Sequence, residues 1–304
     1  MTKLILGVNN CWAVKRFVKP EEWIEITATR FDLKVVQFSF DLLDPRTKLD
    51  VRDAIIAEIL DVAREYGVEI HSAFTGLAAY SFNLLMHPHP GLRADALDWY
   101  EKAIDMASKM NVVAVGGHVA AMTWSDYKDE KRRNLLISYL VESLKYLSIV
   151  AKSKGLRIFL WEPMPIVREP PCTIVEAKKL LEEVNKGNKG VPVKYCIDLG
   201  HACCPWVKDK ESLNPYKWLE ELGKDSPCIH IQQTDGKADR HWPFTEEYNK
   251  VGIIKPEKVI EALEKSGSKE NYLFLEIIHP FEYKEDKVIE EIEISVKYWK
   301  EYLD

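Results

Sequence analysis

The sequence predicts an α/β fold, a single-domain (β/α)₈ TIM barrel over residues 1–304. Short apolar runs alternate eight times with longer segments of helical periodicity. The apolar runs lack strict alternation, as expected when both faces of a parallel sheet are covered. No linker or change in composition divides the chain, and its 304 residues suit one barrel of this kind.

The first four strand–helix units have clear start and stop signals. Pro20 stands where the first helix should begin, because a proline there loses no intrahelical hydrogen bond. Gly67 ends the second helical pattern, as glycine often does. The third pattern carries apolar residues three and four positions apart. The expected strands are Lys3–Asn9, Leu33–Phe40, Val68–Phe74 and Val112–Gly116, and the expected helices are Pro20–Arg30, Arg46–Tyr66, Leu92–Met110 and Asp126–Lys154.

The last four units have similar signals. Thr173 and Glu176 fit a capping box at a helix start. Pro256 lies near the start of a later helix. The expected strands are Leu156–Trp161, Val193–Ile197, Cys228–Ile231 and Tyr272–Leu275, and the expected helices are Thr173–Asn185, Asn214–Gly223, Lys255–Ser266 and Asp286–Tyr302.

A doubly wound open sheet is the alternative to a barrel. Such sheets commonly carry a glycine-rich phosphate-binding turn after the first strand. Here the residues at that place, 7–12, read Gly-Val-Asn-Asn-Cys-Trp, which is not that fingerprint. The barrel is therefore the favoured prediction.

Composition limits the classes of partner. The net charge of −6 argues against a protein whose main partner is nucleic acid, because duplex binding draws on many Lys and Arg contacts. No continuous apolar run approaches the roughly 20 residues of a membrane span, and the N-terminus lacks the apolar core of a secretory signal. We expect a cytoplasmic protein without a membrane partner. The six cysteines form no CxxC pair and are expected as free thiols.

Polar side chains gather where the predicted strands end. In a barrel of this type, active sites lie at the C-terminal ends of the strands. Each residue alone has an ordinary structural explanation, such as a hydrogen-bonded core histidine or a helix cap. Together they point to one site. In chain order they are Asn9, Gln37 or Ser39, His71, His118, Glu162, Asp198 with His201, His230, and Glu276.

Four of these residues end four successive strands: Glu162, Asp198, His230 and Glu276. In a closed barrel those ends point to one place, where three carboxylates would repel one another unless a cation held them. Mixed carboxylate and imidazole ligation suits Mn²⁺, Co²⁺, Mg²⁺ or Zn²⁺. The sequence therefore predicts a divalent metal site.

Seven short motifs stand in or after the predicted strands. They are Ile70-His71-Ser72, Gly117-His118, Trp161-Glu162-Pro163, Ile197-Asp198-Leu199-Gly200-His201, Ile229-His230-Ile231, Asp239-Arg240-His241 and Leu275-Glu276. These motifs resemble the xylose-isomerase-like TIM-barrel superfamily, which holds sugar and sugar-phosphate isomerases and epimerases and also endonuclease IV. The resemblance covers nearly the whole chain.

The resemblance leaves two branches to weigh. A three-zinc nuclease pattern can be laid by residue type onto His71, His118, Glu162, Asp198, His201, His230, Asp239, His241 and Glu276. The epimerase branch implies a single metal, Mn²⁺ first, on Glu162, Asp198, His230 and Glu276. In that branch the other groups contact substrate, with His201 on a substrate oxygen. The expected substrate-binding residues are His71, His118, His201, Lys15, Arg16, Asp239, Arg240 and His241.

The acidic balance and a bulky first loop, Asn9–Phe17, favour the sugar enzymes. The stretches His71–Ser81 and Asp239–Phe244 resemble the tetrulose-phosphate epimerases. A zinc-dependent AP endonuclease, a polyol dehydratase on the same barrel and a non-catalytic binding protein are the alternatives. The family resemblance also implies a homodimer or homotetramer.

The expected chemistry is proton transfer next to a carbonyl. A metal-bound ketose would form an enediolate, with Glu162 and Glu276 as the acid and base on opposite faces. Return of the proton to the opposite face gives epimerisation, and return to the neighbouring carbon gives aldose–ketose isomerisation. If the substrate carries a phosphate, Lys15 and Arg16 are the preferred cations. The further candidates are Arg168, Lys237 and Arg240.

Overall fold

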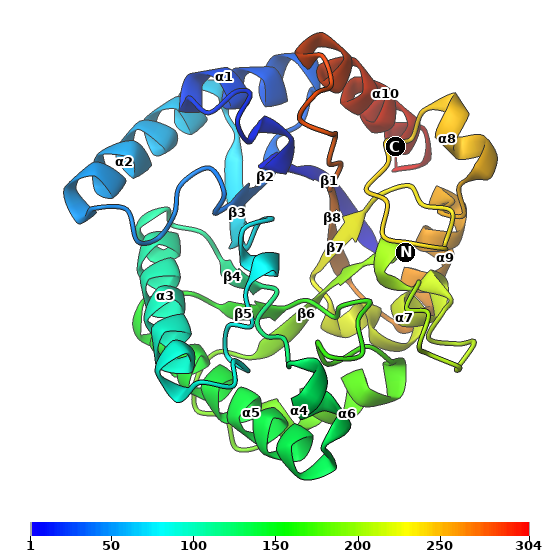
Figure 1. Ribbon diagram of the computed structural model, residues 1–304. Helices are drawn as coiled ribbons and strands as arrows, with labels where there is room; N and C mark the ends of the chain where they lie inside the picture. Colours follow the sequence, from blue (N-terminus) through cyan, green and yellow to red (C-terminus); the bar gives the residue numbers. More distant parts are fainter. Residues whose placement is uncertain (1, 304) are drawn as a thin grey trace.

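The computed structural model describes residues 2–303, so the first and last residues of the predicted domain lie outside the described part. Eight parallel strands close into a barrel in chain order, with β1 beside β8 (Figure 1). The predicted TIM barrel is thus confirmed. The strands are β1 (Lys3–Asn9), β2 (Val35–Ser39), β3 (Glu69–Phe74), β4 (Ala114–Gly117), β5 (Ile158–Trp161), β6 (Val193–Asp198), β7 (Cys228–Ile231) and β8 (Glu270–Leu275).

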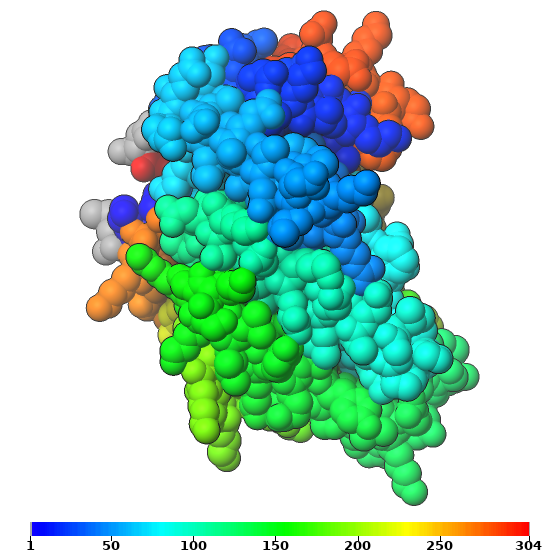
Figure 2. All heavy atoms as spheres, turned by 90° about the vertical axis from the view of Figure 1, so that its left-hand side faces the viewer, coloured from blue at the N-terminus to red at the C-terminus, as the bar shows by residue number. Residues whose placement is uncertain are grey.

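Helices surround the barrel, and Figure 2 shows the face on which α2, α3 and α5 lie side by side. The helices are α1 (Pro20–Glu25), which continues as the π-helical turn η2 (Ile26–Arg30), α2 (Leu49–Tyr66), α3 (Pro90–Lys109), α4 (Trp124–Lys128), α5 (Glu130–Ser153), α6 (Ile174–Asn185), α7 (Pro215–Leu222), α8 (Glu246–Val251), α9 (Pro256–Ser266) and α10 (Glu285–Leu303). Short 3₁₀ turns are η1 (Asn10–Ala13), η3 (Ala79–Ser81), η4 (Leu199–His201) and η5 (Gly223–Asp225).

Two helical predictions were wrong in detail. The helix expected over Asp126–Lys154 is two helices, α4 and α5. Asp129 separates them, with an extended backbone and a carboxylate that accepts the N–H groups of Lys131 and Arg132. Helix α8 was not predicted because none of its six residues is buried, so it has no apolar periodicity to detect.

Helix α5 contains an 18-residue window apolar enough to cross a membrane by length and composition alone. In the fold its buried side chains, among them Leu136, Leu140 and Leu144, belong to the main core cluster. That burial is typical of an outer helix of a barrel, which also needs an apolar face.

One layer of the barrel interior is made of inward-facing side chains, one from each of the strands β2 to β8. This layer consists of Val35, Phe74, Ala114, Leu160, Cys196, Cys228 and Phe274. Side chains alternate between the two faces of a strand, so the residue two positions further on also points inward. Glu162, Asp198, His230 and Glu276 each stand two residues after a member of this layer. The packed layer therefore forms the floor beneath them.

Helix α3 is tied to the site through Tyr100, whose buried hydroxyl donates a hydrogen bond to the carbonyl oxygen of His118, just after β4. Replacement Tyr100→Phe leaves that carbonyl without its donor. We expect a loss of about 1–3 kcal/mol in the free energy of unfolding, measured by urea denaturation. Tyr146→Phe is the matched control, because Tyr146 donates to Glu101 on the exposed helical surface. A loss as small as the control's would contradict this role for Tyr100.

Candidate active site

Four buried side chains converge at the C-terminal mouth of the barrel. Glu162 follows β5, Asp198 ends β6, His230 lies in β7 and Glu276 follows β8. Each offers one ligand atom, and these atoms all lie within 4.8 Å of one another. His230 Nδ1 is 2.9 Å from Glu276 Oε2, 3.3 Å from Glu162 Oε1 and 3.8 Å from Asp198 Oδ2. The structure thus brings together the four residues predicted as metal ligands.

The imidazole of His230 is oriented by Gln37, from β2. Gln37 Oε1 accepts from Asn9 Nδ2 at 2.8 Å and lies 2.6 Å from His230 Nε2, while Gln37 Nε2 donates to Ser72 Oγ at 3.2 Å. Because the amide oxygen can only accept, His230 carries its hydrogen on Nε2. Nδ1 is then the ring nitrogen that faces the carboxylates, as in metal-bound histidines supported by a second hydrogen bond.

The donor set fits a divalent cation. His230 Nδ1 and Glu162 Oε1 are fully buried and make no hydrogen bond to another described residue. Unpaired buried polar atoms of this kind are costly unless something binds them. Burial raises the pKa of Asp198 to about 7. Burial also acts to raise the pKa of Glu276, but His230 opposes it and holds that pKa at about 2. A cation at this point would satisfy all four groups.

Asp198 is held by its own local sequence and by Gln232. Its Oδ1 accepts the N–H of Gly200 at 2.6 Å and the Nε2 of Gln232 at 2.9 Å. A Cβ on Gly200 would lie 2.4 Å from the amide of Gln232, so this position admits only glycine without movement. The same Gln232 Nε2 lies 2.7 Å from Asp239 Oδ1.

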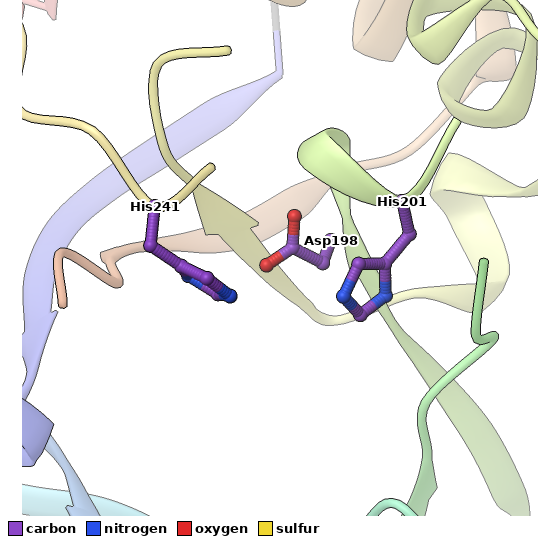
Figure 3. A group of neighbouring side chains, drawn as sticks. All are labelled: Asp198, His201 and His241. Atoms are coloured by element: carbon purple, nitrogen blue, oxygen red, sulfur yellow. The ribbon is translucent and has the colours of Figure 1, made fainter. Parts of the chain in front are cut away.

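A second cluster lies beside the first. In Figure 3 His201, at the end of η4, and His241, on a loop, lie on either side of Asp198. Asp239 Oδ2 is 3.0 Å from His241 Nε2 and 3.4 Å from His201 Nε2. Burial lowers the pKa of both imidazoles, but the neighbouring carboxylates outweigh it. They raise the pKa of His241 to about 9 and that of His201 well above its usual range.

His118 lies behind Tyr80 rather than at the cavity wall. The two rings stack with centroids 5.0 Å apart. Neither ring nitrogen of His118 has a hydrogen-bond partner among the described residues, although Nδ1 lies 3.7 Å from Glu169 Oε2. Burial lowers the pKa of His118 to about 4 and raises that of Glu169 to about 7.

The structure does not bring His71 to this site. His71 is the third of the six residues of β3. Its ring stacks on that of Tyr272 with centroids 3.9 Å apart, and its Nδ1 is 4.0 Å from the Sγ of Cys228 at the start of β7. Burial lowers its pKa to about 4. The expected contact with substrate was wrong, because His71 points into the barrel below the packed layer.

The predicted cationic pair Lys15 and Arg16 is occupied elsewhere. Arg16 has only 4% of its side chain exposed, and its guanidinium donates to carbonyl oxygens of the loop after β8, including Pro280 at 2.5 Å. Lys15 Nζ lies 4.3 Å from the ring centre of Phe281. Neither residue lines the cavity beside the four ligands, so the expected phosphate contact of this pair is not supported.

That cavity has a volume of about 410 Å³, within the range of small-molecule sites. Arg240 is the one arginine in its wall, together with His201, Asp239 and His241 from the predicted set. The guanidinium of Arg240 pairs with Asp235 at 3.0 Å and lies over the ring of Trp242. A larger hollow of about 680 Å³ between α6 and α7 is lined by lysines and carboxylates and lies apart from this chemistry.

The sequence did not single out three residues of the site: Tyr80, Glu169 and Gln232. Gln232 directly follows β7. It stands two residues after His230 and so points to the same side of the strand, which could have identified it as a site residue. Tyr80 and Glu169 lie in loops, where no periodicity indicates which way a side chain points.

Comparisons with known proteins agree with this geometry. Residues 27–300 match the family described as xylose isomerase-like TIM barrel. The D-erythrulose 1-phosphate 3-epimerase of Brucella abortus is 28% identical over 302 residues, covering 99% of this chain and 97% of that protein. The fructoselysine 3-epimerase of Shigella flexneri is 23% identical over 193 residues, 64% of each chain.

Solved structures show the same fold. A Rhodospirillum rubrum crystal structure assigned as a xylose isomerase superposes with a TM-score of 0.91 at 30% identity, covering 98% of this chain and 99% of that one. The D-psicose 3-epimerase of Clostridium cellulolyticum has a TM-score of 0.72 at 17% identity, with both chains fully covered. The relatives named as 3-epimerases are isomerase-class enzymes, as expected for this chain. The chain therefore belongs to the xylose isomerase-like TIM barrel family.

Proposed function

We propose that this protein is a divalent-metal-dependent 3-epimerase of a short ketose phosphate, with a ketotetrose 1-phosphate as the first candidate. The observation that carries the proposal is the arrangement of Glu162 and Glu276. Each turns one carboxylate oxygen toward His230 Nδ1 and keeps a second oxygen free of that contact. The 28% identity to an erythrulose 1-phosphate 3-epimerase, over nearly the full length of both chains, supports the substrate class.

Glu162, Asp198, His230 and Glu276 would hold the ion. When bound there, the ion would polarise the ketose carbonyl and so acidify the C–H bond on the neighbouring carbon. The two glutamates come from different strands, so they can act on opposite faces of that carbon. One removes the proton, and the other returns a proton to the other face, which inverts the centre. His201 and His241, at the cavity wall, would donate to substrate oxygens.

Arg240 supports a phosphorylated substrate. Of the five cations considered from the sequence, it is the one that lines the cavity. A guanidinium can bind two phosphate oxygens at once. Against the effect of burial, Asp239 in the same wall raises the pKa values of His201 and His241, so both imidazoles can donate to a phosphate oxygen.

The three-zinc nuclease alternative takes His71 and His118 as two of its nine ligands. The ring of His71 stacks on Tyr272 and that of His118 on Tyr80, and neither residue belongs to a group of described side chains that could hold a metal ion. Mn²⁺ as the resident ion, a cytoplasmic compartment and a homodimer or homotetramer stay predictions.

The two-carboxylate mechanism predicts that Glu162→Gln and Glu276→Gln each lower kcat by at least about 10²- to 10⁴-fold, the usual contribution of a general acid or base. The measurement is ¹H NMR of erythrulose 1-phosphate in deuterated water, which follows deuterium entry at C3 and the appearance of the other epimer. Circular dichroism and the unfolding midpoint check that each variant folds. Full turnover by either variant would refute the mechanism.

The ion site predicts one Mn²⁺ per chain in calorimetric titration of protein dialysed against EDTA, with a higher unfolding midpoint after loading. Asp198→Ala should abolish this binding, because it removes a ligand. Asp239→Asn is the control, since Asp239 belongs to the neighbouring cluster and should leave the single site intact. Three tightly bound zinc ions per chain, or cleavage of an abasic-site duplex, would instead favour the nuclease.

The role of Arg240 predicts that Arg240→Met raises KM for erythrulose 1-phosphate by about 10- to 100-fold, as expected for one lost charge-assisted hydrogen bond. The KM for unphosphorylated erythrulose should hardly change. Asp235→Asn is the matched control, because it removes the partner of Arg240 but keeps the guanidinium. Equal effects of Arg240→Met on both substrates would contradict a phosphate contact.

A further inference from the structure

The two glutamates differ in what holds their outer oxygens, by which we mean the carboxylate oxygen that does not face His230 Nδ1. Glu276 Oε1 accepts from the side-chain amide of Asn9 at 3.1 Å. Glu162 Oε2 accepts from the hydroxyl of Tyr80 at 2.5 Å. An amide nitrogen can only donate, whereas a phenolic hydroxyl can donate and accept. The pair is therefore asymmetric, although both residues are carboxylates at strand ends.

The supports also differ in their place in the fold. Asn9 ends β1 and is tied to Gln37 within the barrel. Tyr80 lies in η3, in the loop that follows β3, and it lines the cavity. In Figure 1 the cyan segment after β3 lies over the barrel mouth. A hydrogen bond from this loop to Glu162 thus joins the cavity wall to the ligand cluster.

The ring of Tyr80 packs against a buried residue, His118. It stacks on His118, whose backbone N–H donates to Thr75 Oγ1 at 2.9 Å and whose carbonyl accepts from Tyr100. His118 is fully buried, and its ring nitrogens have no hydrogen-bond partner among the described residues. The flat face of its ring, not a ring nitrogen, is what packs against Tyr80.

We propose that Tyr80 is a positioning residue for Glu162. Its hydroxyl holds the outer carboxylate oxygen of Glu162 in line with the substrate carbon, on one face of that carbon only. The inference rests on the proposed epimerase function and deepens it. In the step that uses Glu162, the C3–H bond breaks, the proton passes to Glu162 and the electron pair moves into the carbonyl. The Tyr80 hydroxyl can then turn and accept from the protonated carboxyl, so Glu162 keeps its orientation in both protonation states.

The test is Tyr80→Phe, which keeps the ring stack on His118 and removes only the hydroxyl. We expect kcat to fall about 10- to 100-fold, as for a lost hydrogen bond to a charged group, with little change in KM. Mn²⁺ affinity should be unchanged, because the other oxygen of Glu162 faces the ion site. Tyr146→Phe is the matched control, since Tyr146 also donates to a glutamate, Glu101 Oε1, at 2.7 Å, but on the outer surface.

Deuterium exchange separates positioning from general damage. Each C3 epimer of erythrulose 1-phosphate is incubated with Tyr80→Phe in deuterated water. From the epimer deprotonated by Glu276, deuterium should still enter the recovered starting sugar while epimerisation falls. From the epimer deprotonated by Glu162, both exchange and epimerisation should fall. A merely structural defect would lower exchange equally from both.

Crystal structures of Mn²⁺-loaded wild type and Tyr80→Phe give a readout that needs no substrate. We expect the outer oxygen of Glu162 to turn away in the variant while Asp198, His230 and Glu276 stay in place. An unmoved Glu162, a kcat within about twofold of wild type, or equal loss of exchange from both epimers would overturn the inference. Failure of the proposed function would show differently, as a wild-type protein that exchanges neither epimer, and the crystal comparison would still decide the role of Tyr80.

Discussion

The burial of three carboxylates around one imidazole is the constraint on which the rest of the site depends. Burial disfavours charge, and like charges at this distance repel, so the cluster needs both a cation and directed hydrogen-bond donors. The chain supplies the donors for the carboxylates, and an acceptor for the imidazole, from outside the ligand set. Asn9, Gln232 and Tyr80 each hold one carboxylate, and Gln37 holds the imidazole. In both glutamates the donor binds the oxygen that does not face His230, which leaves the other oxygen for the ion site.

The ligand set could be predicted from the sequence because barrel geometry is regular. Strand ends in a closed barrel converge, and the twofold alternation along a strand puts every second residue inside. Glu162, Asp198, His230 and Glu276 obey both rules, so the residue types and the strand assignment were enough. The same reasoning misplaced His71, because it treated a mid-strand residue as a strand end. His71 lies three residues before the end of β3, where an inward side chain belongs to the barrel interior and not to its mouth.

Residues on loops could not be predicted in the same way. Arg16 and Arg240 are both arginines that follow strands. Nothing in their local sequence indicates that Arg16 is buried against a neighbouring loop whereas Arg240 lines the cavity. The difference comes from the partners, which are the carbonyls of the loop after β8 for Arg16 and Asp235 with Trp242 for Arg240. These partners depend on how each loop folds back. Tyr80 was missed for the same reason.

The hydrogen-bond supports of the imidazole and of both glutamates come from the opposite part of the chain to the ligands, whereas Gln232, the support of Asp198, follows β7. The ligands lie on β5 to β8, whereas Asn9, Gln37, Ser72 and Tyr80 lie on or just after β1 to β3. A fragment that contained only the second half of the barrel would carry every metal-binding group and still leave the imidazole and both glutamates unoriented. Closure of the sheet between β8 and β1 is therefore also the event that assembles the site. During folding, the ability to hold an ion in this geometry should arise only when the two halves meet.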